Sequence, residues 1–282
     1  MRRTAIGLAA LFLAAAANAS AGVSIKLNGG LGFLAQGDYG RALRGSYDRL
    51  VDSYGDVDGT FRPFRDEWRG GLEACVPLGA GFELGIGAAY ERLKAENRFR
   101  YAWSFVALED AIDSRLTVVP VTLSLHYRVS AGKGLFLDVF GGPGYYFADF
   151  EHVQSLGTDF FSYGDAKEFS ARTGAFGFQG GVCFGYALSR GIEIYLQADG
   201  RSARVRELKG DLAVRTSWFL GDSADRTEEA YFWFYESSSG TNPYPLGVFA
   251  GAKPADSSLG EVRAAGLDLS GFGISVGLRF RI

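Results

Sequence analysis

A serine and a histidine two positions apart are the residues of this chain with the clearest potential for chemistry. Ser124 and His126 would lie on one face of a β-strand, because successive side chains of a strand point to opposite sides. A serine in contact with a histidine is the core of a lipase or acyltransferase site, which usually also needs an acid. The other histidine, His152, follows Glu151 in a predicted loop, and we assign it no role.

The remaining polar residues match no pattern typical of a metal or cofactor site. The two histidines and two cysteines are isolated from one another, whereas metal sites need clustered ligands at fixed spacing. Asp52, Asp56 and Asp58 could hold Ca²⁺, but their spacing matches no calcium-loop motif. We therefore predict no catalytic residue, no metal and no cofactor.

Eight segments alternate apolar side chains with polar or small ones. In the last eleven residues the apolar members are Phe272, Ile274, Val276, Leu278, Phe280 and Ile282. A period of two predicts a β-strand with one apolar face, and the length matches the ~9–11 residues with which a tilted strand crosses a bilayer. The eight segments are 23–33, 68–76, 82–91, 119–128, 135–147, 175–188, 192–199 and 272–282.

Short and long connections alternate between these segments. The short ones, at 77–81, 130–134 and 189–191, contain the Gly, Pro and Ser residues of turns, and the long ones cover roughly 35–66, 92–115, 148–172 and 202–265. This asymmetry is typical of bacterial outer-membrane barrels. It predicts an all-β fold, an eight-stranded antiparallel up-and-down transmembrane β-barrel with short periplasmic turns and four long extracellular loops.

Aromatic residues gather at both ends of the apolar faces. Phe82, Tyr127, Tyr186 and Phe280 stand near the turns, and Phe33, Trp68, Tyr90, Tyr145, Phe176 and Phe272 near the loops. Two aromatic belts around an aliphatic band are expected where a barrel wall crosses both membrane interfaces. A soluble barrel such as a lipocalin would instead turn its apolar face inward, and the belts favour the membrane alternative.

The start of the chain predicts export. Arg2 and Arg3 precede an apolar run from 5 to 17 and small residues that form A-x-A sites, so residues 1–21 are a predicted signal peptide cleaved after Ala19 or Ala21. Residues 22–282 are then the barrel domain. No later segment approaches 18 consecutive apolar residues, so no membrane-spanning helix is expected. The mild excess of acidic residues provides no basic footprint for nucleic acid.

With its eight alternating segments and the ending Gly277-Leu278-Arg279-Phe280-Arg281-Ile282, the chain resembles the small eight-stranded outer-membrane barrel superfamily, which includes OmpA-like and OmpW-like barrels. The resemblance implies the outer membrane of a Gram-negative bacterium, contact with membrane lipid and lipopolysaccharide, and folding by the barrel-assembly machinery. Many relatives end in an aromatic residue. Here Ile282 is last, which places Phe280 in the role of the terminal assembly signal, with Ile282 beside it.

Charged residues on the predicted inner faces suggest how the lumen is filled. Arg128 and Asp138 flank one short turn and are expected to meet across it, and Lys26 and Arg279 lie on the two strands that must pair to close the barrel. Buried charges need partners, and an eight-stranded barrel is only wide enough for side chains, so a plug of salt bridges is predicted. The inward charges are Lys26, Glu73, Glu83, Arg128, Asp138, Glu193, Arg279 and Arg281.

Two further features bear on the interior and the surface. Cys75 and Cys183 are predicted on opposite inner walls as buried free thiols, because the gap should exceed the ~7 Å Cα limit of a disulfide. In the connection 202–265, the aromatic run Tyr231–Tyr235 could form a binding surface or pack within its own loop. Segments 212–220 and 230–236 could pair there as a hairpin.

These features predict a monomeric outer-membrane protein that is not an enzyme. Its expected role is that of a structural anchor or surface-interaction protein, with an extracellular ligand possible at 202–265. The alternative is a narrow gated channel for small or apolar solutes, in which the lumen charges would act in gating. A lipid A-modifying enzyme is less favoured, because Ser124 and His126 would face the lumen and not the lipid.

Overall fold

The computed structural model describes residues 22–35, 37–103, 106–158, 164–217, 223–237, 243–255 and 260–282. The predicted signal peptide, 1–21, lies outside these residues, as do Trp218 and Phe219 of the connection 202–265. All of the elements assigned in the described chain are β-strands except one α-helix.

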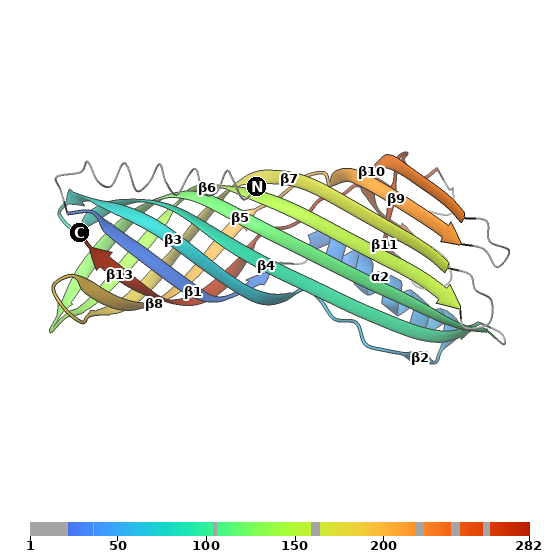
Figure 1. Ribbon diagram of the computed structural model, residues 1–282, viewed down its shortest axis with the longest axis horizontal. Helices are drawn as coiled ribbons and strands as arrows, with labels where there is room; N and C mark the ends of the chain where they lie inside the picture. Colours follow the sequence, from blue (N-terminus) through green and yellow to red (C-terminus); the bar gives the residue numbers. More distant parts are fainter. Residues whose placement is uncertain are drawn as a thin grey trace.

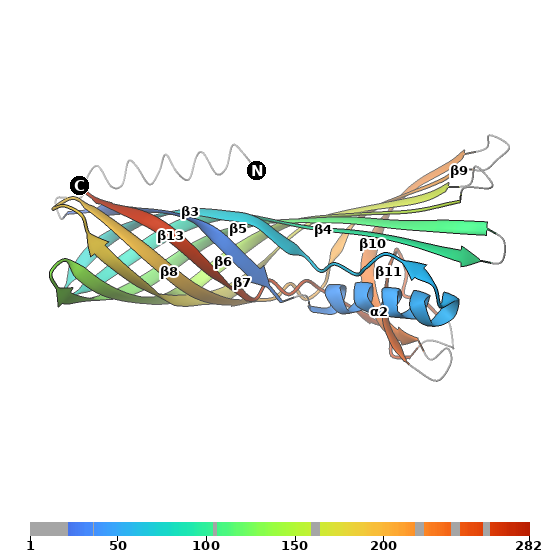
Figure 2. The same cartoon turned by 90° about the horizontal axis from the view of Figure 1, so that it is seen from below.

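Eight strands close a ring in which each pairs antiparallel with the next. The order is β1–β3–β4–β5–β6–β7–β8–β13, and β13 returns to β1. Figures 1 and 2 show this ring as a twisted cylinder that forms one half of the molecule. It contains the eight predicted segments in the predicted order. The bounds are β1 Ser24–Leu34, β3 Arg65–Gly79, β4 Phe82–Trp103, β5 Val106–Gly132, β6 Leu135–Thr158, β7 Gly164–Ala187, β8 Ile192–Ala203 and β13 Gly271–Arg281.

The first and last strands close the ring along their whole length. They pair from Ser24 opposite Arg281 to Leu34 opposite Gly271. Near the end of this ladder Phe33 stacks on Phe272, with ring centroids 4.7 Å apart. Because every strand of the ring has two neighbours, its backbone groups are paired within the sheet, which is the condition for a sheet to lie in lipid.

The long connections contain regular structure that the sequence analysis assigned to loops. β4, β5, β6 and β7 have 22, 27, 24 and 24 residues, so the predicted loops 92–115 and 148–172 are mostly strand. The prediction was wrong there because it followed only outward apolar residues. Beyond the ring the alternation continues with its polarity reversed, so that Leu93 and Phe99 are buried while Arg98 and Arg100 are exposed.

The connection 202–265 continues the same sheet. β9 (Lys209–Ser217) pairs with β7 and with β10 (Ser223–Ser237), which also pairs with β11 (Tyr244–Ala250) and β12 (Arg263–Ala264). A β9–β10 hairpin forms, but the predicted pairing of 212–220 with 230–236 was wrong: the ladder joins 209–217 to 223–231, and residues 231–237 pair with β11. We refer to β9 to β12, the parts of β4 to β7 that lie beyond the ring, and the helix of the connection 35–66 as the extension.

The connection 35–66 holds the helix, α2 (Gly37–Tyr54), followed by β2 (Val57–Asp58), which pairs with β4. The sequence analysis missed α2. Its inner side is built from small and aromatic residues, since Tyr39, Gly40, Ala42 and Gly45 are buried. Gly45 is required because a Cβ there would collide with the backbone of Pro245 on β11. Glycine also weakens helical propensity, which hides the helix from pattern reading.

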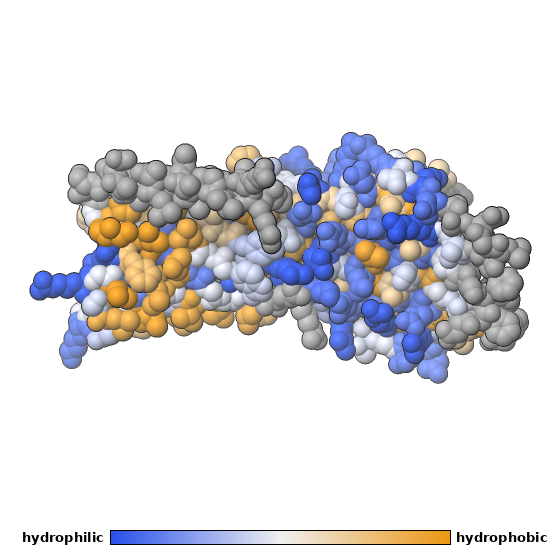
Figure 3. All heavy atoms as spheres, viewed as in Figure 1, coloured by the Kyte–Doolittle hydropathy of each residue, from blue (hydrophilic) through white to orange (hydrophobic). Residues whose placement is uncertain are grey.

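The two halves of the molecule have opposite surfaces (Figure 3). On the ring, apolar side chains point outward, and Leu27, Leu123 and Leu196 are 45%, 45% and 52% exposed. On the extension the outer surface is largely hydrophilic, and the apolar side chains form an interior core that includes Phe150, Phe169, Leu208, Phe232 and Leu269. Among the described residues, no helix is long and apolar enough to cross a membrane.

Candidate functional site

The ring interior next to the short turns holds a first cluster of charges, the turn-end cluster. Arg128 donates two hydrogen bonds to Glu193, at 2.7 and 2.8 Å, and its guanidinium lies 3.6 Å from the centroid of the Phe136 ring. Arg279 donates to Glu83 at 2.6 and 2.8 Å, and Arg281 lies 2.7 Å from Glu193. Paired guanidinium and carboxylate groups of this kind form strong, directional hydrogen bonds.

The middle of the ring holds a second set, the central cluster. Lys26 Nζ donates to Asp138 at 2.8 Å and lies 3.7 Å from Glu73. His126 Nδ1 is 3.1 Å from Asp138, and its Nε2 is 3.0 Å from both Ser124 and Glu73. Ser124 also donates to Glu73. Lys26, His126 and Asp138 are at most 2% exposed, so these groups are buried and depend on one another.

A third set, the extension-end cluster, lies where the ring meets the extension. Arg69 donates to Asp199 at 2.9 and 2.5 Å, and Arg201 donates to Glu91 at 2.6 Å. Gln197 donates to Asp199 at 3.0 Å. The sequence analysis did not include this cluster. Asp199 and Glu91 lay at the ends of predicted strands on the polar phase, which was the available signal.

The predicted inward charges meet in the interior, but their partners differ from those expected. Arg128 and Asp138 are register partners on β5 and β6, yet Arg128 bonds to Glu193 and Asp138 to Lys26. Lys26 and Arg279 are register partners on β1 and β13, and each turns to carboxylates on other strands. Long side chains reach across a narrow lumen, so strand neighbours do not determine ion pairs there.

Little space remains between the central and extension-end clusters. A cavity of about 60 Å³ lies there, lined by residues that include Asn28, Glu73, Thr122, Phe140 and Asp199. A volume of this size holds a few water molecules at most. This part of the ring interior is therefore largely occupied by side chains.

Ser124, His126 and Asp138 have the connectivity of a serine, a histidine and an acid in a hydrolase site. The serine and histidine are each 1% exposed, and the histidine also contacts Lys26 at 3.1 Å. The arrangement is therefore a buried hydrogen-bond network that faces the lumen, as predicted, and not the outer wall.

The same region contains a set of potential metal ligands. Ligand atoms of Glu73, Cys75 and His126 lie within 4.8 Å of one another. The ammonium of Lys26, bonded to Asp138 and 3.7 Å from Glu73, already supplies a positive charge beside them. Cys75 and Cys183 are buried free thiols, as predicted.

The aromatic run on β10 contributes to the extension core. Phe232 and Phe234 are 2% and 5% exposed within that core, and Trp233, on the other face, donates to the carbonyl of Ala250 at 3.0 Å. The buried Phe232 packs against Phe249 of the same connection and against Tyr39 of α2, so packing that reaches beyond the connection accounts for the buried members of the run.

A buried polar contact joins α2 to the wall of the extension. The Tyr39 hydroxyl lies 2.8 Å from Nδ1 of His152 on β6 and also hydrogen-bonds Ser114 on β5. All three residues are at most 4% exposed. Burial lowers the pKa of His152 to about 3 from its ordinary 6.5, so the ring is neutral here. The sequence analysis assigned His152 no role, because its environment is made by residues distant in the chain.

This contact predicts that acid weakens the docking of α2. When α2 is undocked and His152 is exposed to water, the imidazole binds a proton below about pH 6.5, whereas in the docked state it stays neutral until about pH 3. The stability of the docked state is therefore constant above pH 6.5 and falls as the pH drops below it. At pH 5 the loss should be about 2 kcal/mol. Amide hydrogen exchange of 37–54 at pH 7.5 and pH 5, corrected for intrinsic rates, measures it. In His152→Phe the pH dependence should disappear, and an unchanged dependence would contradict this role.

The comparisons with known proteins identify no family. No protein-family model and no curated protein matches the chain. Among solved structures, the crystal structure of a major outer membrane protein from Thermus thermophilus is similar with a TM-score of 0.42 and 9% identity, over 94% of this chain and all of that one. The outer membrane protease OmpT from Escherichia coli is similar with a TM-score of 0.30 and 12% identity, over 93% of this chain and 94% of that one. At these scores, conclusions about function rest on the residues themselves.

Proposed function

We propose that the chain is a bacterial outer-membrane protein, with the ring as an eight-stranded transmembrane barrel and the extension as an extracellular domain. The observation that carries the proposal is the reversal of the outer face from apolar to polar along continuous strands. Short turns would then face the periplasm and the extension the outside. Membrane lipid and lipopolysaccharide would contact the wall, and the outward Phe280 and Ile282 would serve the barrel-assembly machinery as its signal.

The reversal occurs along one continuous row across four strands. Arg92, Thr117, Asp149 and Arg172 are successive register partners on β4, β5, β6 and β7. Two residues closer to the turn end, the same outward face carries Tyr90, Val119 and Phe147. A charge on the lipid face of such a barrel is costly away from the interface, so this row supports a membrane boundary just below it.

A role as an anchor or surface-interaction protein is favoured over a channel. The three charged clusters fill the ring, and above them the extension has a packed apolar core that includes Tyr39, Leu116, Tyr146 and Phe150. A solute would have to displace both. The channel alternative would require the ion pairs to open, and it is distinguished by electrical conductance. We propose a monomer without enzymatic activity.

A closed barrel predicts heat-modifiable migration on a denaturing gel. Unboiled protein folded into lipid vesicles should migrate differently from boiled protein, because a ring with β1 paired to β13 has no edge from which to unravel. The same vesicles treated with protease should keep a fragment that contains the ring strands. Identical migration of boiled and unboiled samples would argue against the closed transmembrane ring.

A further inference from the structure

The extension contains a pocket lined by arginines, close to the proposed membrane boundary. It has a volume of about 580 Å³ and is lined by Arg41, Arg44, Phe61, Pro63, Arg204 and Pro245, together with Gly37 and Gly40. Four of these residues, Gly37, Gly40, Arg41 and Arg44, follow the spacing of one helical face. The lining thus combines three guanidinium groups with an aromatic ring, and none of its described residues is acidic.

The nearby carboxylates leave these arginines an excess of positive charge. Asp38 already accepts two hydrogen bonds from Arg263, at 2.7 and 2.9 Å, in addition to its ion pair with Arg41. The hydrogen bonds from Arg263 hold the pKa of Asp38 below its ordinary value. Arg44 lies 3.5 Å from Asp48 in an exposed pair, which binds weakly in water, and its guanidinium faces the Phe61 ring at 5.8 Å. Asp268 pairs through its backbone with Arg204 and lies beside Gly37, and its carboxylate accepts a hydrogen bond from the backbone N–H of Ser270 at 3.0 Å. Among the described residues, no ion pair involves Arg204.

The pocket lies beside the membrane boundary of the proposed barrel. Figure 2 shows α2 beginning just beyond the end of β1 and running away from the ring. Gly37 is four residues after Phe33 of the aromatic pair, which is at most ~14 Å of chain. Arg204 directly follows Ala203, the last residue of β8. The pocket is therefore at the height where lipid headgroups lie if the ring spans the membrane.

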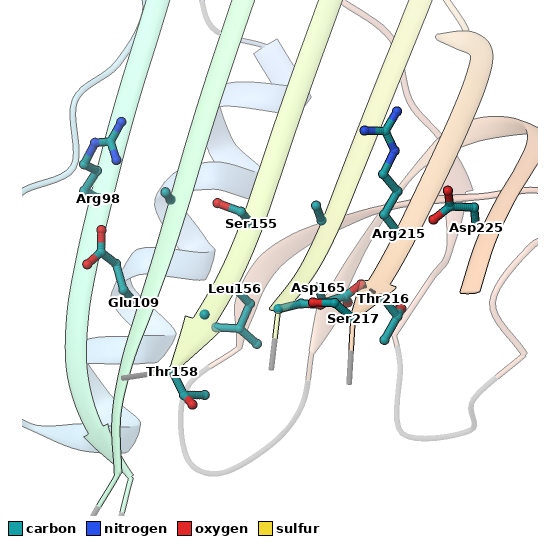
Figure 4. A pocket seen from close by; sticks show the side chains of 14 residues that line it. Arg98, Glu109, Ser155, Leu156, Thr158, Asp165, Arg215, Thr216, Ser217 and Asp225 are labelled. Atoms are coloured by element: carbon teal, nitrogen blue, oxygen red, sulfur yellow. Dashed lines mark hydrogen bonds between the residues drawn. The ribbon is translucent and has the colours of Figure 1, made fainter. Parts of the chain in front are cut away.

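Other surfaces of the extension have different chemistry. A cavity of about 710 Å³ on β6, β7, β9 and β10 is lined by Asp149, Glu151, Glu168, Asp211 and Glu229, with Arg172 and Lys209 as its cations. The groove at the tip, shown in Figure 4, mixes Arg98 and Arg215 with Glu109, Asp165 and Asp225. Both of these linings contain carboxylates, so an anion is expected to prefer the arginine pocket.

From this geometry we infer that the arginine pocket binds the phosphate group of an outer-leaflet lipid. Guanidinium groups bind phosphate oxygens through paired, charge-assisted hydrogen bonds, and the pocket offers three from two separate elements. Phe61 and the two prolines provide an apolar side for the part of the ligand next to the phosphate. The inference rests on the proposed function, because only a membrane-embedded ring brings the pocket to the headgroups. A soluble phosphate ester has the same chemistry and must be distinguished by experiment.

The test measures lipid binding by the full chain folded in detergent, using native mass spectrometry. The probes are lipid A carrying its phosphates and the same lipid A after dephosphorylation, with inorganic phosphate as competitor. In the variant Arg44→Gln/Arg204→Gln, occupancy by phosphorylated lipid A should fall at least tenfold, while dephosphorylated lipid A should bind wild type and variant equally. The matched control is Arg172→Gln, which removes an exposed arginine from the acidic cavity and should leave occupancy unchanged. If the double variant does not fold, Arg204→Gln alone replaces it and is expected to lower occupancy by phosphorylated lipid A at least threefold.

Three results would overturn the inference. Equal losses in the pocket variant and in Arg172→Gln would mean that the pocket is not the site. Displacement of lipid A by millimolar inorganic phosphate would assign the pocket to a soluble phosphate compound. Heat-modifiable migration is recorded for every sample. A wild type that folds in detergent and inserts into the lipid vesicles of the heat-modifiability test but does not bind lipid A refutes the pocket alone, whereas failure to insert into those vesicles refutes the proposed function.

Discussion

Replacing Lys26 with methionine should destabilise the folded ring by about 3–5 kcal/mol, the usual cost of removing one member of a buried charge pair. Lys26 is the cation of the central cluster, within 2.8 Å of Asp138 and 3.7 Å of Glu73. Without it, two carboxylates would face each other around His126 in an interior with little room for water. The free energy of unfolding in urea, measured with the protein in lipid vesicles, gives the effect.

The matched control is Lys167→Met, on the part of β7 that lies in the extension. Lys167 has a side chain that is 46% exposed, and its closest carboxylate, that of Asp165, is 3.9 Å away, so a change below about 1 kcal/mol is expected. Adding Asp138→Asn to Lys26→Met should recover part of the loss, because it removes one of the stranded charges. Similar stabilities of Lys26→Met and Lys167→Met would show that the central cluster does not hold the ring together.

The second large effect is expected on the outer wall of β5. Leu123→Arg should destabilise the inserted protein by ~2–4 kcal/mol, the cost of an arginine on the lipid face near the membrane centre. Leu123 is 45% exposed and lies midway along the apolar face between Tyr127 and Val119. Ala111→Arg places the same side chain on the same face of the same strand, beyond the polar row, and should cost less than about 1 kcal/mol.

Urea unfolding in vesicles compares these two variants directly. The proposed membrane boundary predicts a clear gap between them, with lipid around position 123 and water around position 111. Equal losses would place both positions in the same surroundings and would contradict the proposed boundary between Tyr90 and Arg92.

The ring could be predicted from the sequence because one physical signal repeats in it. An apolar outer face and packed polar side chains inside impose a period of two, as in Phe272 to Ile282, and glycines such as Gly277 leave room in the narrow interior for Tyr195. The order of the strands then follows from alternating short and long connections. Even the closure of β1 on β13 needs only that an antiparallel ring have no edge.

The extension could not be predicted because the outer face of single strands changes from apolar to polar along their length. On β4, outward positions pass from Tyr90 to Arg92 while inward ones pass from Glu91 to Leu93. The period of two persists, but the apolar phase moves to the other face, and a search for one continuous apolar face stops at that point. A search that followed the residues on both faces of each strand would have predicted the full length of β4, β5, β6 and β7.

The partners within the site could not be predicted, because they depend on distances across the lumen. That Lys26, Arg128 and Glu193 point inward follows from their phase along the strands. Arg128 bonds to Glu193, whereas its register neighbour Asp138 bonds to Lys26. These pairings depend on the twist of the sheet and on side-chain length. The docking of Tyr39 against His152 likewise joins residues 113 positions apart.

The measurement that tests the central claim most directly is the conductance of the purified wild-type protein in planar lipid bilayers. Because the three clusters and the extension core fill the path through the ring, the inserted wild-type protein is expected to carry no steady current. Arg128→Ala, which removes the guanidinium held between Glu193 and Phe136, should raise conductance by opening space at the turn end. A large, steady current in the wild type that Arg128→Ala leaves unchanged would contradict the filled interior and establish the channel in its place.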